Sequence, residues 1–339
     1  MATQSTDTRT FDDLFTTTFE NVASGIQDNI YESNAVFAKL NEAGNIQTFD
    51  GGTELHEPII TAENDSFASY SPGGTFDTTE QEQFSRAQYQ IRFVGGTIVW
   101  NREDERRNSG ESAMENFVSE RINAGTAQMK QELNKQLLAL TKGDANDIDG
   151  IPLAISNAPT TSGSYGSFDG STDSFWVNQA TSTSTTWADL IKDVMTMSVN
   201  CQLGASGAPD FYLTDPTTWT IFAGAMQNSV RIGDKLSGNL GFDSIQFRGA
   251  PMFFDTMVPD PANSIQFPNT LTNGTVYALN SNAMKLKVDK LSNIAMLDLQ
   301  VPTTQPTTRV RPIVWYGNLC VSERRALGVH DTITLTIVA

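Results

Sequence analysis

The sequence predicts an α+β protein on three observations. A single amphipathic helix is expected from Ser109 to Lys142, which is long for a compact domain. A polar, glycine-containing segment, Ser66 to Glu80, returns through an alternating strand at Ala87–Val94 and so predicts a long hairpin. Beyond Gly241 the apolar residues occur in short runs, which is typical of short strands. Because an isolated hairpin is only marginally stable, this one is expected to lie on a second molecule, which favours assembly over catalysis.

Composition limits the possible functions. The chain has 339 residues and a formal charge of 22 − 39 = −17. A surface this acidic argues against binding nucleic acid by phosphate neutralisation, although an acidic protein could enclose nucleic acid without gripping it. The only basic cluster, Arg102 to Arg107, is interleaved with acids. No apolar run approaches the roughly 18 residues of a membrane span, and the first ten residues do not resemble a secretory signal. Synthesis in a cytoplasm is therefore expected.

The N-terminal elements follow from hydrophobic spacing. Apolar residues recur every three or four positions from Phe11 to Ile30, which predicts an amphipathic helix, and a short helix is expected at Asn34–Leu40. The outgoing hairpin strand is Thr53–Ile60, where Pro58 indicates an edge position. In the return strand the alternation predicts one face with Tyr89, Ile91 and Phe93, and an opposite face with Gln88, Gln90 and Arg92.

The long helix has signals at both ends. Ser109 is a good N-cap and Gly143 follows the last expected turn. Acidic residues gather in its first half and lysines in its second, which suits the helix dipole. At about 1.5 Å per residue it would span on the order of 50 Å. One side carries the apolar residues Met114, Phe117, Val118, Ile122, Met129, Leu133, Leu137 and Leu140. The helix is therefore interpreted as a spine.

The C-terminal half mixes helices and strands. Helices are expected at Trp187–Leu203 and from Pro216 to Val230, the second preceded by Asp215 as N-cap. Asn273–Gly274 is the strongest hairpin signal. Strands are expected at Ile245–Phe247, Met252–Phe254, Val276–Leu279, Met284–Val288, Val310–Trp315, Leu319–Val321 and Thr332–Ile337.

No constellation of residues predicts chemistry. Two histidines, His56 and His330, are too few for a metal site or an obvious general base. Asp144–Gly150 resembles the start of a calcium loop, but the positions that need carboxylates hold Ala145 and Ser156. There is no P-loop and no nucleophile elbow. Cys201 and Cys320 are expected to be reduced and buried. The sequence therefore predicts neither an enzyme nor a cofactor or metal site.

Several segments, taken in order, resemble one family: the HK97-fold major capsid proteins of tailed bacteriophages. The matching segments are Gly51–Pro58, Ala62–Asn64, Ser69–Ser71, Phe76–Thr79, Ser109–Ala113, Asp149–Pro152, Phe175–Asn178, Phe247–Pro251, Tyr277–Asn280 and Tyr316–Arg325. Each segment alone is a weak signal. Their shared order over about residues 20–330 makes the resemblance specific.

The resemblance implies the domains of an HK97-like capsid fold. The N-terminal arm would be residues 1–50, and the extended hairpin called the E-loop would be 51–97. The P-domain would be 98–146 and 301–339, with the spine helix at 109–142, and the A-domain would be 147–300. It also implies contacts between subunits. Those contacts are expected to involve Phe67, Tyr70, Phe76, Arg102, Glu105, Arg106 and Arg107.

The function implied is a major capsid protein. Each subunit would lay its E-loop across the spine helix of a neighbour, and copies would assemble into hexamers and pentamers of an icosahedral head enclosing the dsDNA genome. The expected partners are other copies, a portal protein, a separate scaffolding protein and a possible decoration protein, with no membrane. The location implied is the virion capsid, assembled in the host bacterial cytoplasm. No charged scaffolding segment precedes the arm, and nothing in the sequence supports a covalent cross-link.

Two other classes compete with this interpretation. A structural fibre, tube or adhesin protein of a phage particle is the main alternative, because Ser/Thr-rich β proteins are common there. The long interior helix argues against it. An enzyme with dispersed carboxylates ranks third.

Overall fold

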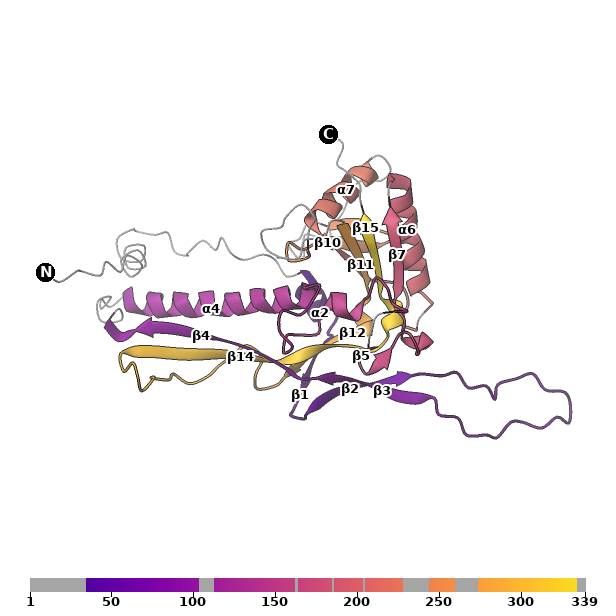
Figure 1. Ribbon diagram of the computed structural model, residues 1–339, viewed down its shortest axis with the longest axis horizontal. Helices are drawn as coiled ribbons and strands as arrows, with labels where there is room; N and C mark the ends of the chain where they lie inside the picture. The colour runs from indigo at the N-terminus through magenta and orange to yellow at the C-terminus, as the bar shows by residue number, and fades with distance from the viewer. Residues whose placement is uncertain are drawn as a thin grey trace. The chain divides into compact units, whose positions relative to one another are not determined.

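The computed structural model describes residues 35–103, 113–161, 164–184, 186–203, 205–227, 244–259 and 274–333. The chain divides into two compact units, and Figure 1 labels their elements. Within the described residues, the first unit contains 93–133 and 291–315, and the second contains 35–92, 134–290 and 316–333. No helix in the described ranges is long and apolar enough to cross a membrane.

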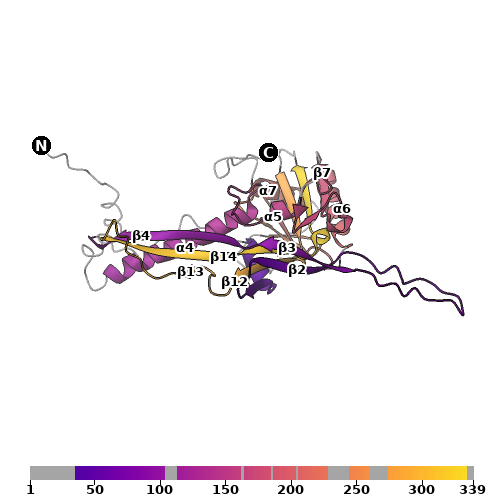
Figure 2. The ribbon, with the colours of Figure 1, turned by 60° about the horizontal axis from the view of Figure 1, so that its bottom comes forward.

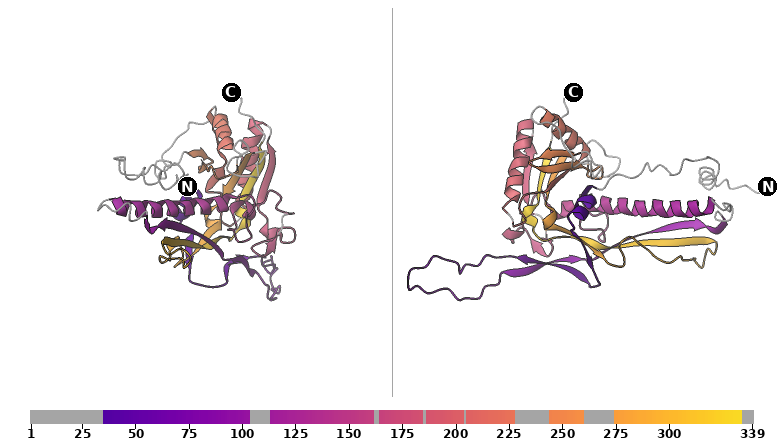
Figure 3. Two further views of the ribbon diagram at one scale, coloured as in Figure 1. Left: turned by 60° about the vertical axis from the view of Figure 1, so that its left-hand side comes forward. Right: turned by 180° about the vertical axis from the view of Figure 1, so that it is seen from behind.

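The first unit is a sheet covered by the long helix. Strand β14 (Thr308–Val321) pairs with β4 (Arg92–Asn101) and with β13 (Ala295–Met296). Helix α4 (Ala113–Leu138) runs along this sheet, as both views of Figure 3 show. Gly125 lets the helix approach closely, because a β-carbon there would stand 2.6 Å from Ile98 Cδ1 and 3.7 Å from Ile313 Cδ1. Ile98 and Ile313 therefore mark the sheet face that α4 covers.

The long predicted helix is confirmed, but it ends earlier than expected. It stops at Leu138, so Ala139–Lys142 are not helical, and its predicted start at Ser109 lies outside the described residues. Tertiary packing ends it. Gly150 crosses the last turn so closely that a β-carbon there would be 2.7 Å from Leu137 O. Lys142 then turns to pair with Asp149.

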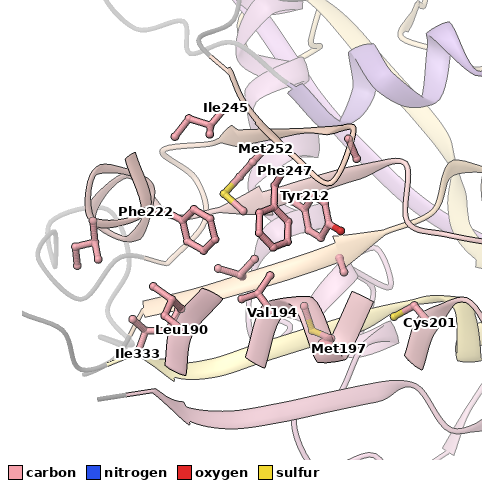
Figure 4. Close-up of a cluster of buried hydrophobic side chains, with 14 residues drawn as sticks. Leu190, Val194, Met197, Cys201, Tyr212, Phe222, Ile245, Phe247, Met252 and Ile333 are labelled. Carbon is pink, nitrogen blue, oxygen red and sulfur yellow. The ribbon is translucent and has the colours of Figure 1, made fainter. Parts of the chain in front are cut away.

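The second unit is built on a six-stranded sheet with the order β7-β15-β11-β8-β10-β9. Helices α6 (Trp187–Cys201) and α7 (Pro216–Gln227) pack against one face of it and enclose the hydrophobic cluster of Figure 4. The strands are β7 (Gln179–Ser184), β8 (Phe211–Thr214), β9 (Ser244–Phe247), β10 (Ala250–Phe254), β11 (Gly274–Leu279) and β15 (Gly328–Ile333). Short elements connect them: α5 (Ile151–Ala154), β5 (Ser164–Tyr165), β6 (Phe168–Asp169), η1 (Ser174–Trp176), η2 (Ser281–Ala283) and η3 (Arg324–Ala326).

A second set of strands in this unit carries the hairpin. The later part of β14 pairs with β12 (Met284–Asp289), which pairs in parallel with β1 (Ile46–Phe49). Helix α2 (Ala35–Glu42) contributes the buried Val36 and Leu40. Within the described residues, the hairpin strands β2 (Glu54–Ile60) and β3 (Phe84–Gln90) pair only with each other, so Pro58 does lie in an edge strand. Figure 2 shows the segment between them extending beyond the paired strands.

The predicted return strand is wrong in one respect. Ile91 belongs to no strand and separates β3 from β4. This break shifts the alternation by one residue, so Phe93 is exposed and Val94 is buried, whereas Tyr89 is buried as expected. Tyr89 and Phe93 therefore do not belong to one alternating pattern, because Tyr89 lies in β3 and Phe93 lies in β4.

Three other expectations need correction. Val310–Trp315 and Leu319–Val321 form one uninterrupted strand, β14. The last strand begins at Gly328 rather than Thr332, and residues beyond Ile333 lie outside the described part of the chain. Gly274 lies in β11 and not in a turn, and the neighbours of β11 in the described part of the chain are β8 and β15; Asn273 lies outside the described residues. The predicted helix at Phe11–Ile30 also falls outside the described residues.

Candidate assembly surface

The segment 61–83 between β2 and β3, here called the hairpin tip, exposes large aromatic side chains. Phe67, Tyr70 and Phe76 are 87%, 64% and 66% exposed. The rings of Tyr70 and Phe76 lie 4.8 Å apart and so cover part of each other. Three predicted contact residues therefore share one projecting segment, where their apolar surface faces water. Exposed apolar groups gathered in this way are typical of an interaction site.

Few backbone hydrogen bonds hold the hairpin tip together. Thr61 N donates to Gln83 O at 2.9 Å where the tip begins, and Gly74 N donates to Ser71 O at 2.8 Å. Side chains supply local turns instead. The hydroxyl and the amide of Thr79 both donate to Asp77 Oδ1, which holds the pKa of that carboxyl below its usual range. Among the described residues the tip has no sheet partner, and it has no core within its own segment.

The base of the hairpin is anchored by a buried carboxylate. Glu57 of β2 is 1% exposed, and its oxygens lie 2.8 Å from Lys285 Nζ and 2.6 Å from Lys287 Nζ, both on β12. Lys287 Nζ also donates to His56 O at 2.8 Å. A buried carboxylate is costly unless paired, so these contacts fix β2 against β12.

Tyr89 anchors the other strand. Its hydroxyl donates to Val321 O at 2.7 Å and accepts from Val321 N at 3.3 Å. Its ring packs edge-on against Tyr165, with the centroids 5.4 Å apart. Burial raises the pKa of Tyr89 far above its usual value, so the hydroxyl stays protonated and remains a donor. Gly166, beside this ring, has no room for a β-carbon, which would lie 2.8 Å from the tyrosine oxygen.

A polar cluster around Asp149 lies next to this anchor. The Asp149 carboxylate pairs with Arg92 at 3.4 Å and with Lys142, and it accepts from Asn318 Nδ2 at 2.6 Å. Asn318 Nδ2 also donates to Gln90 O, the last residue of β3. The side chains of Glu54, Arg92, Lys142 and Asp149 line a polar cavity of about 350 Å³. The hairpin thus combines a firmly held base with an exposed tip.

The charged segment Arg102–Arg107, here called the connector, lies only partly within the described residues. Arg102 is exposed, and its backbone N donates to Thr307 O at 2.8 Å. Glu105, Arg106 and Arg107 lie outside the described residues, so the structure neither joins them to Arg102 nor separates them from it.

Sequence reasoning missed the anchoring residues. Glu57, Tyr89 and Asn318 were not expected to hold the hairpin. One signal was present: Leu55, Glu57 and Ile59 alternate along β2, so the period of a strand places Glu57 on the buried face. Nothing local indicated Asn318, because its partners are Gln90 and Asp149.

Both cysteines and His330 are buried, whereas His56 is exposed. Cys201 and Cys320 are free and buried, and burial raises the pKa of each thiol to about 12. Burial lowers the pKa of His330, whose Nδ1 lies 2.9 Å from Thr181 Oγ1. The Asp144–Gly150 tract forms a turn in which Asp144 and Asp147 bond to backbone amides. Within the described ranges no three His, Cys, Asp or Glu residues gather to hold a metal ion.

Comparison with known proteins identifies the fold. No protein-family model matches the sequence, and no curated protein matches it. The cyanophage A-1(L) capsid aligns with a TM-score of 0.67 and 14% identity, covering 94% of this chain and 98% of that chain. The SrpI encapsulin of Synechococcus elongatus aligns at 0.56 with 11% identity (93% and 95% covered), and the capsid of Myoviridae phage XM1 at 0.55 with 13% identity (93% and 97% covered). The chain has the HK97-like fold of these shell proteins.

Proposed function

We propose that this chain is the major capsid protein of a tailed phage and that copies of it assemble into the hexamers and pentamers of an icosahedral head. The supporting observation is the fold match to the cyanophage capsid subunit over nearly the whole of both chains. A match of this extent includes the hairpin and the long helix as well as the central sheet. The function proposed is therefore mechanical, and no catalytic role is assigned.

The hairpin is the element we assign to assembly. Its base is fixed by Glu57 and Tyr89, whereas its tip exposes Phe67, Tyr70 and Phe76. A rigid base aims the tip, and burying three aromatic rings on another copy supplies a driving force of about 1.5–3 kcal/mol for each fully buried ring. A closed shell repeats each such contact many times, so individually weak contacts suffice.

The domain assignment belongs to the same proposal. We assign the arm to residues 1–50, the E-loop to 51–97, the P-domain to 98–146 and 301–339, and the A-domain to 147–300. We also assign Arg102, Glu105, Arg106 and Arg107 to contacts between subunits. Support for the last assignment is the exposure of Arg102 at the start of the connector.

Charge is consistent with a container. A protein with a formal charge of −17 repels the phosphates of an enclosed dsDNA genome and does not adhere to it. We further propose a separate scaffolding protein, a portal protein and a possible decoration protein as partners, and a virion capsid assembled in the host cytoplasm.

One other function has specific support. The match to the SrpI encapsulin complex shows that the same fold occurs in another kind of shell, and its TM-score of 0.56 is lower than the 0.67 of the cyanophage capsid. The contents of the particle separate the two, because a phage head holds DNA protected from nuclease. The fibre, tube or adhesin alternative has no comparable structural match among these proteins.

Electron microscopy of the recombinant protein, produced with the product of its upstream gene, tests the proposal. Closed icosahedral shells are expected. Tubes or fibres would support the structural alternative, and a stable monomer at high concentration would contradict assembly altogether.

A further inference from the structure

Two positively charged side chains share one carboxylate oxygen beside the polar cavity of the second unit. Arg92 Nη2 lies 3.4 Å from Asp149 Oδ1, and Lys142 Nζ contacts the same oxygen. The other carboxylate oxygen, Oδ2, is already occupied, because it accepts from Asn318 Nδ2 at 2.6 Å. Arg92 Nη1 donates to the neutral Ala145 O at 2.9 Å. Within the described residues neither cation contacts a second carboxylate.

The charge of this cluster is therefore unbalanced, and the cluster is largely shielded from water. The side chains of Arg92, Lys142 and Asp149 are 15%, 23% and 11% exposed, and their summed charge is 2 − 1 = +1. Charges taken out of water are normally paired in proteins, because an unpaired one loses its hydration. The sign of the excess is opposite to that of the whole chain, whose formal charge is −17. One further negative group would balance the cluster.

The cavity next to the cluster has room for such a group. Its volume of about 350 Å³ falls within the range of about 300–1,000 Å³ that is typical of small-molecule sites. All of its lining residues belong to the second unit. Besides the charged side chains, hydroxyl and carboxamide groups line it, and both kinds can donate hydrogen bonds to an oxyanion. These groups belong to Gln88, Gln90, Ser164 and Ser167.

Hydrogen bonds hold the walls of the cavity in place. Asp149 N donates to Asn318 Oδ1 at 3.0 Å, and Asn318 Nδ2 donates to Gln90 O at 2.9 Å, so the carboxylate of Asp149 is fixed against β3. Gln88 N donates to Gly166 O at 3.1 Å, which joins the turn between β5 and β6 to the same strand. A site with fixed walls loses little conformational freedom when a ligand binds, and this favours affinity.

A second carboxylate on the cavity wall limits the charge of a ligand. Glu54 of β2 lines the same cavity, but it is exposed, so its charge is hydrated and does little to balance the buried cluster. It would repel a ligand that carries several negative charges. The cavity is therefore suited to a ligand with a single negative charge.

We propose that this cavity binds a small oxyanion of single negative charge, a carboxylate or a monobasic phosphate, whose charged group lies beside Arg92 and Lys142. The anion supplies the acceptor that the two cations share too thinly in Asp149, and the hydroxyls of Ser164 and Ser167 donate to its other oxygens. Binding joins the start of β4, the segment that follows α4 and the β5–β6 turn. The site gives the subunit a ligand, which goes beyond a mechanical function.

Thermal unfolding of the full-length protein in sodium phosphate or sodium acetate, compared with sodium chloride at equal ionic strength, tests the site. Phosphate stabilises most folded proteins, so the decisive comparison is between variants. We expect the unfolding temperature of the wild type to rise by about 2 °C more than that of Lys142→Gln. Lys130→Gln removes the same charge from the exposed side of α4 and should respond as the wild type does. The anion with the larger effect identifies the group that the site prefers. Equal responses of wild type and Lys142→Gln to both anions would overturn the proposal.

Two substitutions at the cavity should change the affinity in opposite directions. Lys142→Gln removes an attracting charge and should raise the apparent dissociation constant about tenfold, whereas Glu54→Gln removes a repelling charge and should lower it about threefold. The dependence of the unfolding temperature on anion concentration gives both constants, and circular dichroism checks that each variant folds. Because Glu54 is exposed, its variant tests the site even if Lys142→Gln is unfolded. A response that does not saturate, or a Glu54→Gln variant that binds no more tightly than wild type, would contradict an anion site.

Discussion

Glu57 Oε1 lies 2.6 Å from Lys287 Nζ, and the glutamate is 1% exposed. This pair joins an outgoing hairpin strand to β12, so the direction of the hairpin is set by a contact far from its tip. We expect Glu57→Gln to lower the free energy of unfolding by about 2 kcal/mol, less than a fully buried pair because both lysines reach solvent. Chemical denaturation measures this. Glu80→Gln, on the exposed hairpin tip, is the control and should be neutral.

Gly125 should resist the usual stabilisation by alanine. In an open helix, Gly→Ala gains about 1 kcal/mol of helix propensity. At Gly125 the new β-carbon would lie 2.6 Å from Ile98 Cδ1, and overpacking of this kind costs about 1–3 kcal/mol, so the net effect should be destabilising. Gly224→Ala in α7, where nothing lies within 4 Å, should be stabilising. A stabilised Gly125→Ala variant would mean that α4 is not seated on Ile98.

Both thiols should be unreactive in the folded protein. Cys201 and Cys320 are buried and burial raises their pKa values to about 12, so little thiolate exists at pH 8. A maleimide or aromatic disulfide reagent should label neither residue until denaturant is added, when two thiols should react. A Ser71→Cys variant, with its thiol on the exposed tip, should be labelled at once and serves as the positive control. Rapid labelling of the wild type would contradict the described core.

His330 should make stability depend on pH. Its pKa is lowered in the folded protein by burial, so the unfolded chain binds a proton more readily. Stability from this group is therefore complete above the unfolded pKa of about 6.5 and is lost as the pH falls below it. The stability of the wild type relative to His330→Gln should fall between pH 7 and pH 5.5. A difference that stays constant across that range would contradict the burial of His330.

The sequence predicted those elements whose causes are local. The spacing from Met114 to Leu137 was sufficient to predict the long helix, and the polar segment around Phe67 was sufficient to predict the projecting hairpin. Boundaries set by tertiary contacts were missed. The helix ends at Leu138 because Gly150 packs on its last turn, and no residue near Leu138 predicts a helix end there.

The same reasoning explains the errors in the strands. Tyr316–Asn318 interrupts an apolar run and was expected to divide two strands, yet Asn318 is buried within β14 because Gln90 and Asp149 satisfy its side chain. Gly274 was interpreted as part of a turn, but a β-carbon there would lie 1.9 Å from Thr218 Oγ1, so glycine is required by packing. In both cases the deciding partner is distant in sequence.

The account depends most directly on the hairpin tip, and deletion of Asn64–Gly74 tests it. Electron microscopy and sedimentation of the deleted protein, produced as the wild type is, give the measurement. We predict a folded subunit that unfolds at the wild-type temperature but forms no shells. The deletion removes the rings of Phe67 and Tyr70 and no core residue. Particles of normal size and yield from the deleted protein would contradict the central claim.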